Sequence, residues 1–174
     1  MAKTFVLTFV ADDRPGLVER LSETIAAEGG NWLESRMAHL AEKFAGIARI
    51  EIPDANVSPL KDALTALDEK GFHLTVSSAE GSVTTEGHQF EINLEGLDHP
   101  GIVRDISHCL KSHGASIEEL KTETQDVPMS GGTLFRARVC VRLPAGLSEE
   151  DLRNSLELLS GALMVDITLG EVSD

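Results

Sequence analysis

The sequence predicts an α+β fold that is built twice, each copy with the element order β-α-β-β-α-β. The stretch ADDRPGLVERLS, residues 11–22, recurs as GLDHPGIVRDIS, residues 96–107, and the spacing of 85 residues is close to half of the 174-residue chain. A strand-like segment precedes each stretch, with clear alternation of apolar and polar residues in HQFEINLE, and apolar residues at helical spacing follow each Pro-Gly pair.

The two copies align without a gap from residues 11–35 to residues 96–120. Seven of these 25 positions are identical, and three more exchange one aliphatic residue for another. The shared positions are turn residues and core positions, which favours a duplicated unit over chance resemblance. The identical pairs are Asp13/Asp98, Pro15/Pro100, Gly16/Gly101, Val18/Val103, Ser22/Ser107, Gly29/Gly114 and Glu34/Glu119.

Each copy opens with a strand, KTFVLTFV or HQFEINLE, and in the second strand Phe90, Ile92 and Leu94 alternate with polar residues, as is typical of a half-buried sheet. Pro15 and Pro100 suit the first turn of the helix that follows. The apolar residues of this helix recur on one face, and Gly29 and Gly114 are expected to cap its C-terminus.

Two further strands, a second helix and a closing strand complete each copy. The strands NWLESRMAHL and FAGIARIEI, and in the second copy SIEELKTET and TLFRARVCVRL, are expected to form hairpins, the latter joined by QDVPMSGG. The second helix is predicted in VSPLKDALTALDEKG, with Ser58 as N-cap and Gly71 as C-cap. Its counterpart is predicted in LSEEDLRNSLELLSG, where Ser148 and Asp151 form a capping-box pattern. The closing strands are FHLTVS and MVDITL.

This order is the split βαβ arrangement of ferredoxin-like sandwiches, in which two helices cover one face of a four-stranded antiparallel sheet. The predicted domains are residues 1–80 and 87–174, and the polar, glycine-containing stretch 79–88 is expected to link them. Because each copy is small, the two are expected to pack together.

Composition and charge exclude several classes of protein. The chain has 15 Lys and Arg against 29 Asp and Glu, a formal net charge of -14, which disfavours direct binding of nucleic acid. It has no signal-peptide pattern at its N-terminus and no apolar run near the roughly 20 residues of a membrane span, so we expect a cytoplasmic protein that does not bind membranes. Cys109 and Cys140, without a C-x-x-C pattern, indicate reduced thiols, and no metal or cofactor is expected.

The turn DDRPGLV, followed one helix later by EGGNW, resembles the ACT domain, the amino-acid-sensing module of metabolic regulation. Two tandem ACT copies without a catalytic or DNA-binding domain are similar to the glycine cleavage system transcriptional repressor group. This resemblance implies a non-catalytic regulatory protein that binds a small amino acid, with glycine as the first candidate. It also implies that the protein modulates transcription through a partner regulator, and leaves a homodimer open.

In this family, the strand-to-helix loop and the residue after the first helix hold an amino acid across the interface of two ACT units. Ser116 departs from the Asn of the family pattern, whereas Asn31 of the first copy matches it. Carried over to this sequence, the ligand-binding positions are Asp13, Arg14, Gly16 and Asn31 in the first copy and Asp98, His99, Gly101 and Ser116 in the second.

The residues of the Asp-x-Pro-Gly turn allow two interpretations. A glycine lets a ligand approach the backbone, the amides of an opening helix attract a carboxylate, and Asp13 or Asp98 balances an ammonium group. Asn31 offers a donor and an acceptor to either end of an amino acid. The alternative is that each aspartate only caps helix amides.

Other polar residues have structural interpretations. Cys109 and His113 share a helix face at the spacing of a metal-binding or nucleophilic pair, but Cys109 is expected to pack in the core. His108 and His113 are expected at the solvated surface. Trp32 is expected to anchor the core or an interface. The arginine row is expected to pair with acidic residues of the neighbouring strand. This row comprises Arg136, Arg138 and Arg142.

Two other functions stay open. A small ferredoxin-like enzyme that hydrolyses acyl phosphates needs a fixed cation in an anion-binding loop, and Arg14 is the candidate, but the acidic pair beside it repels phosphate. A purely structural oligomerisation module is the other alternative.

Overall fold

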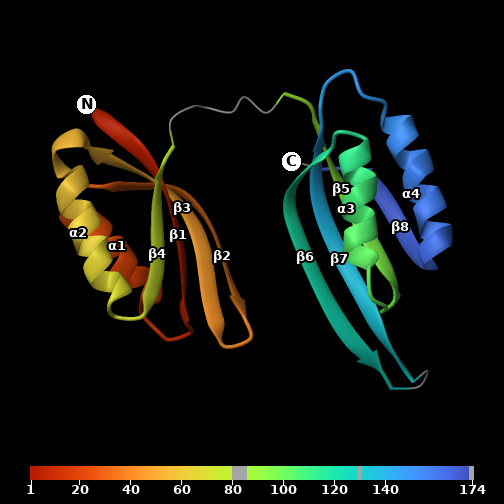
Figure 1. The fold of residues 1–174 in the computed structure, drawn as a ribbon, viewed down its shortest axis with the longest axis horizontal. Coiled ribbons are helices and arrows are strands. Elements are labelled where there is room, and N and C mark those ends of the chain that lie inside the picture. The colour runs from red at the N-terminus through yellow and green to blue at the C-terminus, as the bar shows by residue number, and fades with distance from the viewer. Residues whose placement is uncertain (80–85, 129–130, 173–174) are drawn as a thin grey trace. The chain divides into compact units, whose positions relative to one another are not determined.

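The computed structural model of the chain describes residues 1–79, 86–128 and 131–172. It divides into two compact units, Met1–Val83 (unit 1) and Thr84–Asp174 (unit 2), each with the predicted order β-α-β-β-α-β (Figure 1). Most of the predicted linker and part of the QDVPMSGG turn lie outside the described residues. The domain bounds 1–80 and 87–174, and the packing of the two units against each other, stay predictions.

Unit 1 is a four-stranded antiparallel sheet of strand order β2-β3-β1-β4, with two helices on one face (Figure 1). Because β1 and β3 are the inner strands, their alternate residues are buried under the helices. The strands are β1 (Ala2–Asp12), β2 (Asn31–Leu40), β3 (Lys43–Pro53) and β4 (Phe72–Ser78). The helices are α1 (Leu17–Ala27) and α2 (Val57–Asp68), with a 3-10 turn (Asp54–Asn56) before α2.

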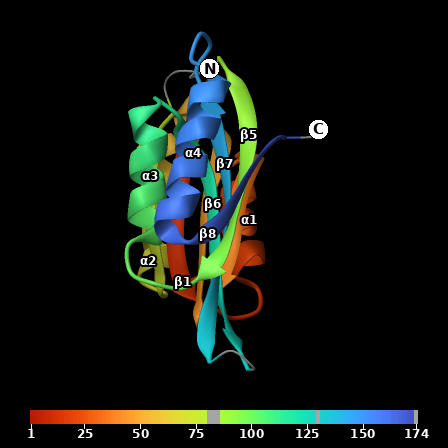
Figure 2. The ribbon, with the colours of Figure 1, turned by 90° about the vertical axis from the view of Figure 1, so that its right-hand side faces the viewer.

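Unit 2 repeats this topology with the strand order β6-β7-β5-β8. Figure 2 shows α3 and α4 on one side of its sheet, and the ferredoxin-like α+β prediction is therefore confirmed for both copies. The strands are β5 (His88–Leu97), β6 (Ser116–Val127), β7 (Gly132–Leu143) and β8 (Val165–Glu171), and the helices are α3 (Ile102–Ser112) and α4 (Glu149–Leu163).

Each unit has its own hydrophobic core between the helices and one face of the sheet. Leu7 of β1 and Leu21 of α1 are fully buried in unit 1, and the aligned residues Ile92 and Ile106 are buried in unit 2. Burying one such side chain contributes about 1.5–3 kcal/mol. Trp32 is partly buried against the core of unit 1, as the packing interpretation predicts. No helix in the described residues is long and apolar enough to cross a bilayer.

The first helix of each unit ends as the glycine pattern predicts. Gly29 has φ 71° and its N–H donates to the Ala26 carbonyl, while the Gly30 N–H donates to the Ile25 carbonyl, both at 2.9 Å. This pair of bonds is a Schellman motif, which satisfies carbonyls at the end of the helix. The same two bonds recur around Gly114 in unit 2.

The first helix of each unit starts later than predicted. Gly16 and Gly101 are the N-cap residues and have φ values of 87° and 101°, which no residue of a right-handed helix adopts. Pro15 and Pro100 therefore lie in the turn before the helix and not in its first turn. The prediction for the prolines is wrong because the following glycine reverses the chain direction.

The second helix of unit 1 also differs from its predicted caps. Asn56, not Ser58, is the N-cap, because the 3-10 turn starts the helical path early. The Asn56 side chain does not cap α2, since its Nδ2 donates to the Glu28 carbonyl at 2.8 Å. The C-cap is Glu69, two residues before Gly71, so Gly71 ends the turn after the helix.

The second helix of unit 2 begins as predicted. The Ser148 hydroxyl accepts a hydrogen bond from the Asp151 N–H at 3.1 Å, which satisfies one of the amides at the N-terminus of α4. The helix continues past Gly161 to Leu163 and ends where Met164 takes a left-handed conformation, φ 54°. The carbonyl oxygen of Leu163 lies 3.2 Å from Nε2 of His99 in the strand-to-helix loop of the same unit.

Candidate functional site

The candidate ligand-binding loops, residues 13–16 and 98–101, lie at corresponding places in the two units. Each loop directly follows the first strand of its unit and precedes the first helix. The Asp13 N–H donates to the Glu42 carbonyl at 3.0 Å, and the Asp98 N–H donates to the Thr133 carbonyl at 2.8 Å. Each bond joins the first residue of the loop to the hairpin of its own unit, so corresponding hydrogen bonds fix the two loops.

Each loop needs its glycine mainly because the backbone there has a positive φ, and less because space for a side chain is lacking. An added Cβ on Gly16 would lie 3.8 Å from Glu19 Oε2, which is ordinary contact, and on Gly101 it would lie 2.9 Å from Arg104 Nη2, the end of a flexible side chain. The positive φ is the stronger constraint, because left-handed backbone is unfavourable for residues with a Cβ.

The helix that follows each loop presents N–H groups that have no partner within the helix. No side chain caps α1 or α3 at its N-cap, whereas Ser148 caps α4. Uncapped amides and the helix dipole together favour an anion at this end. Each loop therefore offers a place for a carboxylate.

The two loop aspartates do not cap these helices. Among the described residues, no helix N–H donates to the carboxylate of Asp13 or Asp98. Asp13 Oδ2 lies 3.4 Å from Nε2 of His39 on β2, and the Asp98 carboxylate has no partner in the described part of the chain. The capping interpretation is not supported, and both carboxylates are exposed beside the amides.

The second residue of each loop points to the end of the second helix of its own unit. Arg14 Nη2 donates to the Lys70 carbonyl at 2.8 Å. At the aligned position, His99 Nε2 lies 3.2 Å from the carbonyl oxygen of Leu163, and its Nδ1 lies 3.2 Å from that of Pro100. Because carbonyl oxygens only accept, Arg14 acts as a donor, and a neutral His99 donates to one of its two carbonyl oxygens through the ring nitrogen that carries the proton.

Asn31 and Ser116 lie far from the loop of their own unit. Asn31 pairs with Glu51, which pairs with Thr4 near the start of β1, whereas the loop follows Asp12 at its end. Eight residues of strand separate these points, about 26 Å at 3.3 Å per residue. Ser116 has the same place in unit 2, so neither unit brings the two halves of the predicted site together.

The pair Cys109 and His113 is a structural feature. His113 Nδ1 lies 2.9 Å from the Cys109 carbonyl oxygen, and its Nε2 lies 3.0 Å from the Ser155 hydroxyl of α4. The prediction that His113 is solvated is wrong, because α4 packs over it. Cys109 packs against the core as predicted, and burial raises the pKa of its thiol. No group of three His, Cys, Asp or Glu in the described residues is arranged to hold a metal ion.

The arginine row on the open face of unit 2 is ion-paired. Cross-strand pairing was predicted and is confirmed, although Arg142 pairs with β6 and not with the first strand of the unit. Hydrogen bonds from Asn93 and Arg138 lower the pKa of the Glu91 carboxyl. The ion pairs are Arg136–Glu95, Arg138–Glu91 and Arg142–Glu118.

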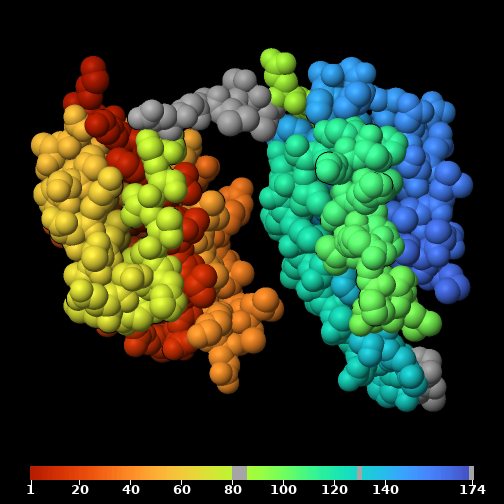
Figure 3. Space-filling model, in the orientation of Figure 1, coloured from red at the N-terminus to blue at the C-terminus, as the bar shows by residue number. Residues whose placement is uncertain are grey.

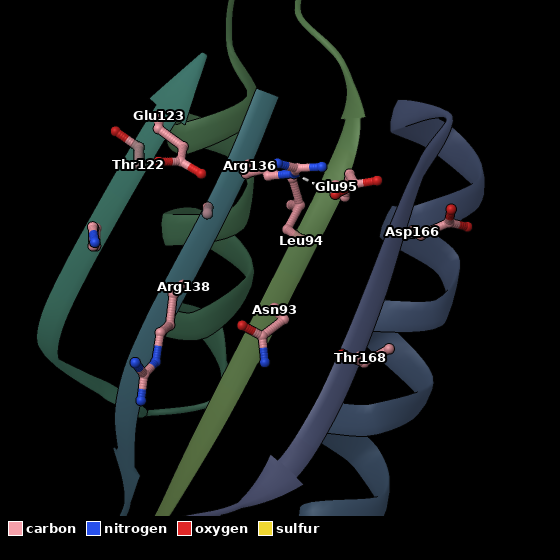
Figure 4. Close-up of a pocket in the computed structure, with 11 residues that line it drawn as sticks. Asn93, Leu94, Glu95, Thr122, Glu123, Arg136, Arg138, Asp166 and Thr168 are labelled. Atoms are coloured by element: carbon pink, nitrogen blue, oxygen red, sulfur yellow. Dashed lines mark hydrogen bonds and ion pairs between the residues drawn. The ribbon is translucent and has the colours of Figure 1, made fainter. Parts of the chain in front are cut away.

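A shallow depression of about 360 Å³ lies on this open face (Figure 4). Its charged side chains come from four neighbouring strands, and Figure 4 shows Arg136 directed at Glu95 across the floor. None of the predicted ligand-binding residues lines it. The residues labelled in Figure 4 are Asn93, Leu94, Glu95, Thr122, Glu123, Arg136, Arg138, Asp166 and Thr168.

Comparison with known families and structures agrees with this fold. Residues 3–77 match the family model of the ACT domain. The crystal structure of an unknown protein from Galdieria sulphuraria is 31% identical, with a TM-score of 0.90, and the alignment covers 99% of this chain and 100% of the other. Among curated proteins, none matches the chain.

A second solved structure, described as that of a candidate glycine cleavage system transcriptional repressor, has a TM-score of 0.74. The two chains are 19% identical, and the alignment covers 100% of this chain and 99% of the other. At this identity the likeness concerns the fold: both chains consist of two such units in tandem.

Proposed function

Residues 3–77 belong to the ACT-domain family, and on this premise we propose that the chain is a regulatory protein without catalytic activity. It binds a small amino acid, with glycine as the first candidate, and modulates transcription through a partner regulator protein. Ligand binding acts by favouring one conformation of the protein over another, so the ligand must bind the two conformations with different affinities.

The observation that carries this proposal is the repeated loop. Each loop places uncapped helix amides beside an aspartate carboxylate that no helix amide uses. The amides suit the carboxylate of an amino acid, and Asp13 or Asp98 suits its ammonium group. A small ligand such as glycine presents only these two charged groups, and the loop provides a counterpart for each.

Asn31 contributes to this site only with a loop from another ACT unit, since its own loop lies about 26 Å away along the strand. Its amide both donates and accepts hydrogen bonds, whereas Ser116 has a single short hydroxyl. A site that contains Asn31 is therefore expected to bind more tightly than one that contains Ser116.

The alternative of an acyl phosphate hydrolase is disfavoured by the position of Arg14. Its guanidinium donates to the Lys70 carbonyl, and the adjacent carboxylates of Asp12 and Asp13 repel a phosphate. A purely structural oligomerisation module does not need uncapped amides at the start of α1 and α3. Such a module would bind no amino acid, which distinguishes it from the proposed regulatory protein.

Thermal unfolding of the full-length chain with each of the 20 amino acids tests ligand binding. A ligand at 100 times its Kd stabilises the folded state by about 2.7 kcal/mol, a clear rise in Tm. The D13N/D98N double variant should weaken binding at least about tenfold. The matched control is Asp62→Asn, an exposed carboxylate of α2 that belongs to neither loop, which should bind as the wild type does.

Regulation through a partner is tested separately. The tagged full-length chain should retain a transcription regulator from cell extract, and the retained amount should change with added ligand in the wild type but not in the D13N/D98N variant. A chain that binds an amino acid but retains no regulator contradicts the regulatory part of the proposal alone.

A further inference from the structure

His99 of the unit 2 loop has two contacts that a neutral imidazole does not satisfy together. Its Nδ1 lies 3.2 Å from the Pro100 carbonyl oxygen, and its Nε2 lies 3.2 Å from the Leu163 carbonyl oxygen. A neutral ring carries one N–H, so its other nitrogen turns a lone pair toward a carbonyl oxygen, and the two repel. The protonated ring donates at both nitrogens, so this geometry suits the imidazolium form.

The end of α4 also favours a positive charge at this position. Leu163 is the last residue of α4, and its carbonyl group is one of those that find no partner within a helix. Such groups give the C-terminus of a helix a partial negative charge, which stabilises a nearby cation. At the aligned position of unit 1, Arg14 donates to the Lys70 carbonyl. The side chain that makes this contact in unit 1 is thus a permanent cation.

The other charged groups around His99 are mainly carboxylates. Asp98 precedes it in the loop, and no cation of the described residues pairs with Asp98. The pKa of the Asp105 carboxyl in α3 is lowered mainly by a hydrogen bond from Arg104, and to a smaller extent by the charge of His99. Arg104 is itself paired with Asp105, with 2.7 Å between Nε and Oδ1. Residues 164–165, which follow α4, are uncharged, so the surroundings favour a protonated ring.

From these contacts, we propose that His99 is a positioning residue that holds the unit 2 loop in its protonated form and releases it on losing the proton. Histidine is the side chain that ordinarily changes charge between about pH 5 and 8, whereas arginine stays charged. The closed loop binds the proton more tightly than the open loop. Its stabilisation is therefore complete at low pH and is lost as the pH rises through the titration of the ring. The unit 1 loop, held by Arg14, has no such dependence.

The pH dependence of the loop has a consequence for the proposed ligand. Asp98 and the amides at the start of α3 lie on either side of His99 in the chain. When the ring no longer donates to both carbonyl oxygens, the carboxylate and the amides lose their fixed separation. An amino acid that needs both groups then has to order the loop, and it binds less tightly. This consequence rests on the proposed amino-acid binding, whereas the pH dependence of the loop does not.

Hydrogen exchange of two backbone amides in the full-length chain tests the proposal. The Asp98 N–H donates to the Thr133 carbonyl and the Asp13 N–H to the Glu42 carbonyl, so the protection of each amide measures how firmly its loop is closed. Between about pH 5.5 and about pH 8, the protection factor of Asp98 should fall at least about threefold, because one hydrogen bond of the ring is lost. The protection factor of Asp13 should stay constant over this range.

Three variants separate this role from a purely structural one. His99→Arg supplies the permanent cation of unit 1 and should keep Asp98 protected at both pH values, and His99→Ala should leave it weakly protected at both. Arg14→His should give Asp13 the pH dependence of Asp98. The matched control is His88→Gln, an exposed histidine at the other end of β5, which should behave as the wild type does.

The proposal is overturned if the protection of Asp98 does not depend on pH, or if it depends on pH equally in His99→Arg. It is also overturned if His88→Gln removes the dependence. Calorimetric titration with glycine at the same two pH values tests the consequence for the ligand: the wild type should bind more weakly at the higher pH, and His99→Arg equally at both. If Asp98 depends on pH as expected but the unfolding screen finds no amino acid that binds, the positioning role stands and the proposed function alone fails.

Discussion

The guanidinium of Arg14 donates a hydrogen bond to the carbonyl oxygen of Lys70, 2.8 Å away in the turn that follows α2. The aligned residue of unit 2, His99, makes the corresponding contact with Leu163 at the end of α4. An arginine in unit 1 and a histidine in unit 2 thus connect corresponding loops to the segment at the end of the second helix of each unit. This connection indicates that the second loop residue fixes the position of the backbone amides and the aspartate on either side of it.

Replacing Arg14 by Ala should lower the free energy of unfolding by about 1 kcal/mol, because a charge-assisted hydrogen bond at the surface is lost. Urea denaturation of the full-length chain measures this change. Arg20→Ala removes an exposed arginine of α1 whose side chain makes no such bond, and should change stability by less than about 0.5 kcal/mol. Equal effects of the two substitutions would contradict the role of Arg14 as a brace.

Replacing Asn31 by Ala should weaken amino-acid binding roughly tenfold to a hundredfold, because a hydrogen bond to a charged ligand group is lost. Ser116→Ala should change the affinity little, since the shorter hydroxyl contributes less. Titration calorimetry with the amino acid found in the unfolding screen measures both. Loss of binding in Ser116→Ala with full binding in Asn31→Ala would show that the family positions do not carry over.

The isolated chain should not retain duplex DNA in a gel-shift experiment, even at low salt. Its net charge is -14, and the arginines on the open face of unit 2 are neutralised by glutamates. The E91A/E95A double variant removes the partners of Arg138 and Arg136, and should raise DNA affinity at low salt if pairing masks these cations. Salt-sensitive retention by the wild type would contradict action through a partner.

The stability of unit 2 should fall in acid partly through Glu118. A hydrogen bond from Arg142 lowers the pKa of Glu118 below its ordinary value of 4.5. A lowered folded-state pKa stabilises the protein above the unfolded value, and this contribution is lost as the pH falls through the folded value. The side chains of Arg142 and Glu118 are only 18% and 27% exposed, so solvent screens this pair less than the other ion pairs.

Glu118→Gln should therefore be less stable than the wild type at pH 7, and the difference should shrink as the pH is lowered below about 4.5. Urea denaturation between pH 3 and pH 7, the interval in which carboxyl groups titrate, measures the difference. Glu157→Gln, on the exposed side of α4, should follow the wild type at every pH. A difference for Glu118→Gln that does not depend on pH would exclude the ion pair as its source.

Local sequence patterns predicted the helices and strands well where a single local property, such as the conformational freedom of a glycine, determines the backbone. The predicted strand NWLESRMAHL has the bounds of β2, Asn31–Leu40, and the glycine at position 29 marks the helix end. Ser58 was misassigned as a cap because propensity does not indicate that a 3-10 turn starts the helix early. His113 was placed at the surface because its own helix does not reveal that Ser155 of another helix contacts it.

The sequence by itself determined the duplicated α+β fold, the ion pairing of the arginine row and the position of the two glycine loops, because periodicity and turn chemistry act over a few residues. The tertiary structure alone decided what surrounds each loop. It directed Arg14 to Lys70, left the carboxylates of Asp13 and Asp98 without a hydrogen bond from the described helix amides, and placed Asn31 at the opposite end of its unit. It also left the outer strand β6 exposed beside α3, as Figure 3 shows. These relations join residues distant in sequence, so they depend on how strands and helices pack and not on local propensity.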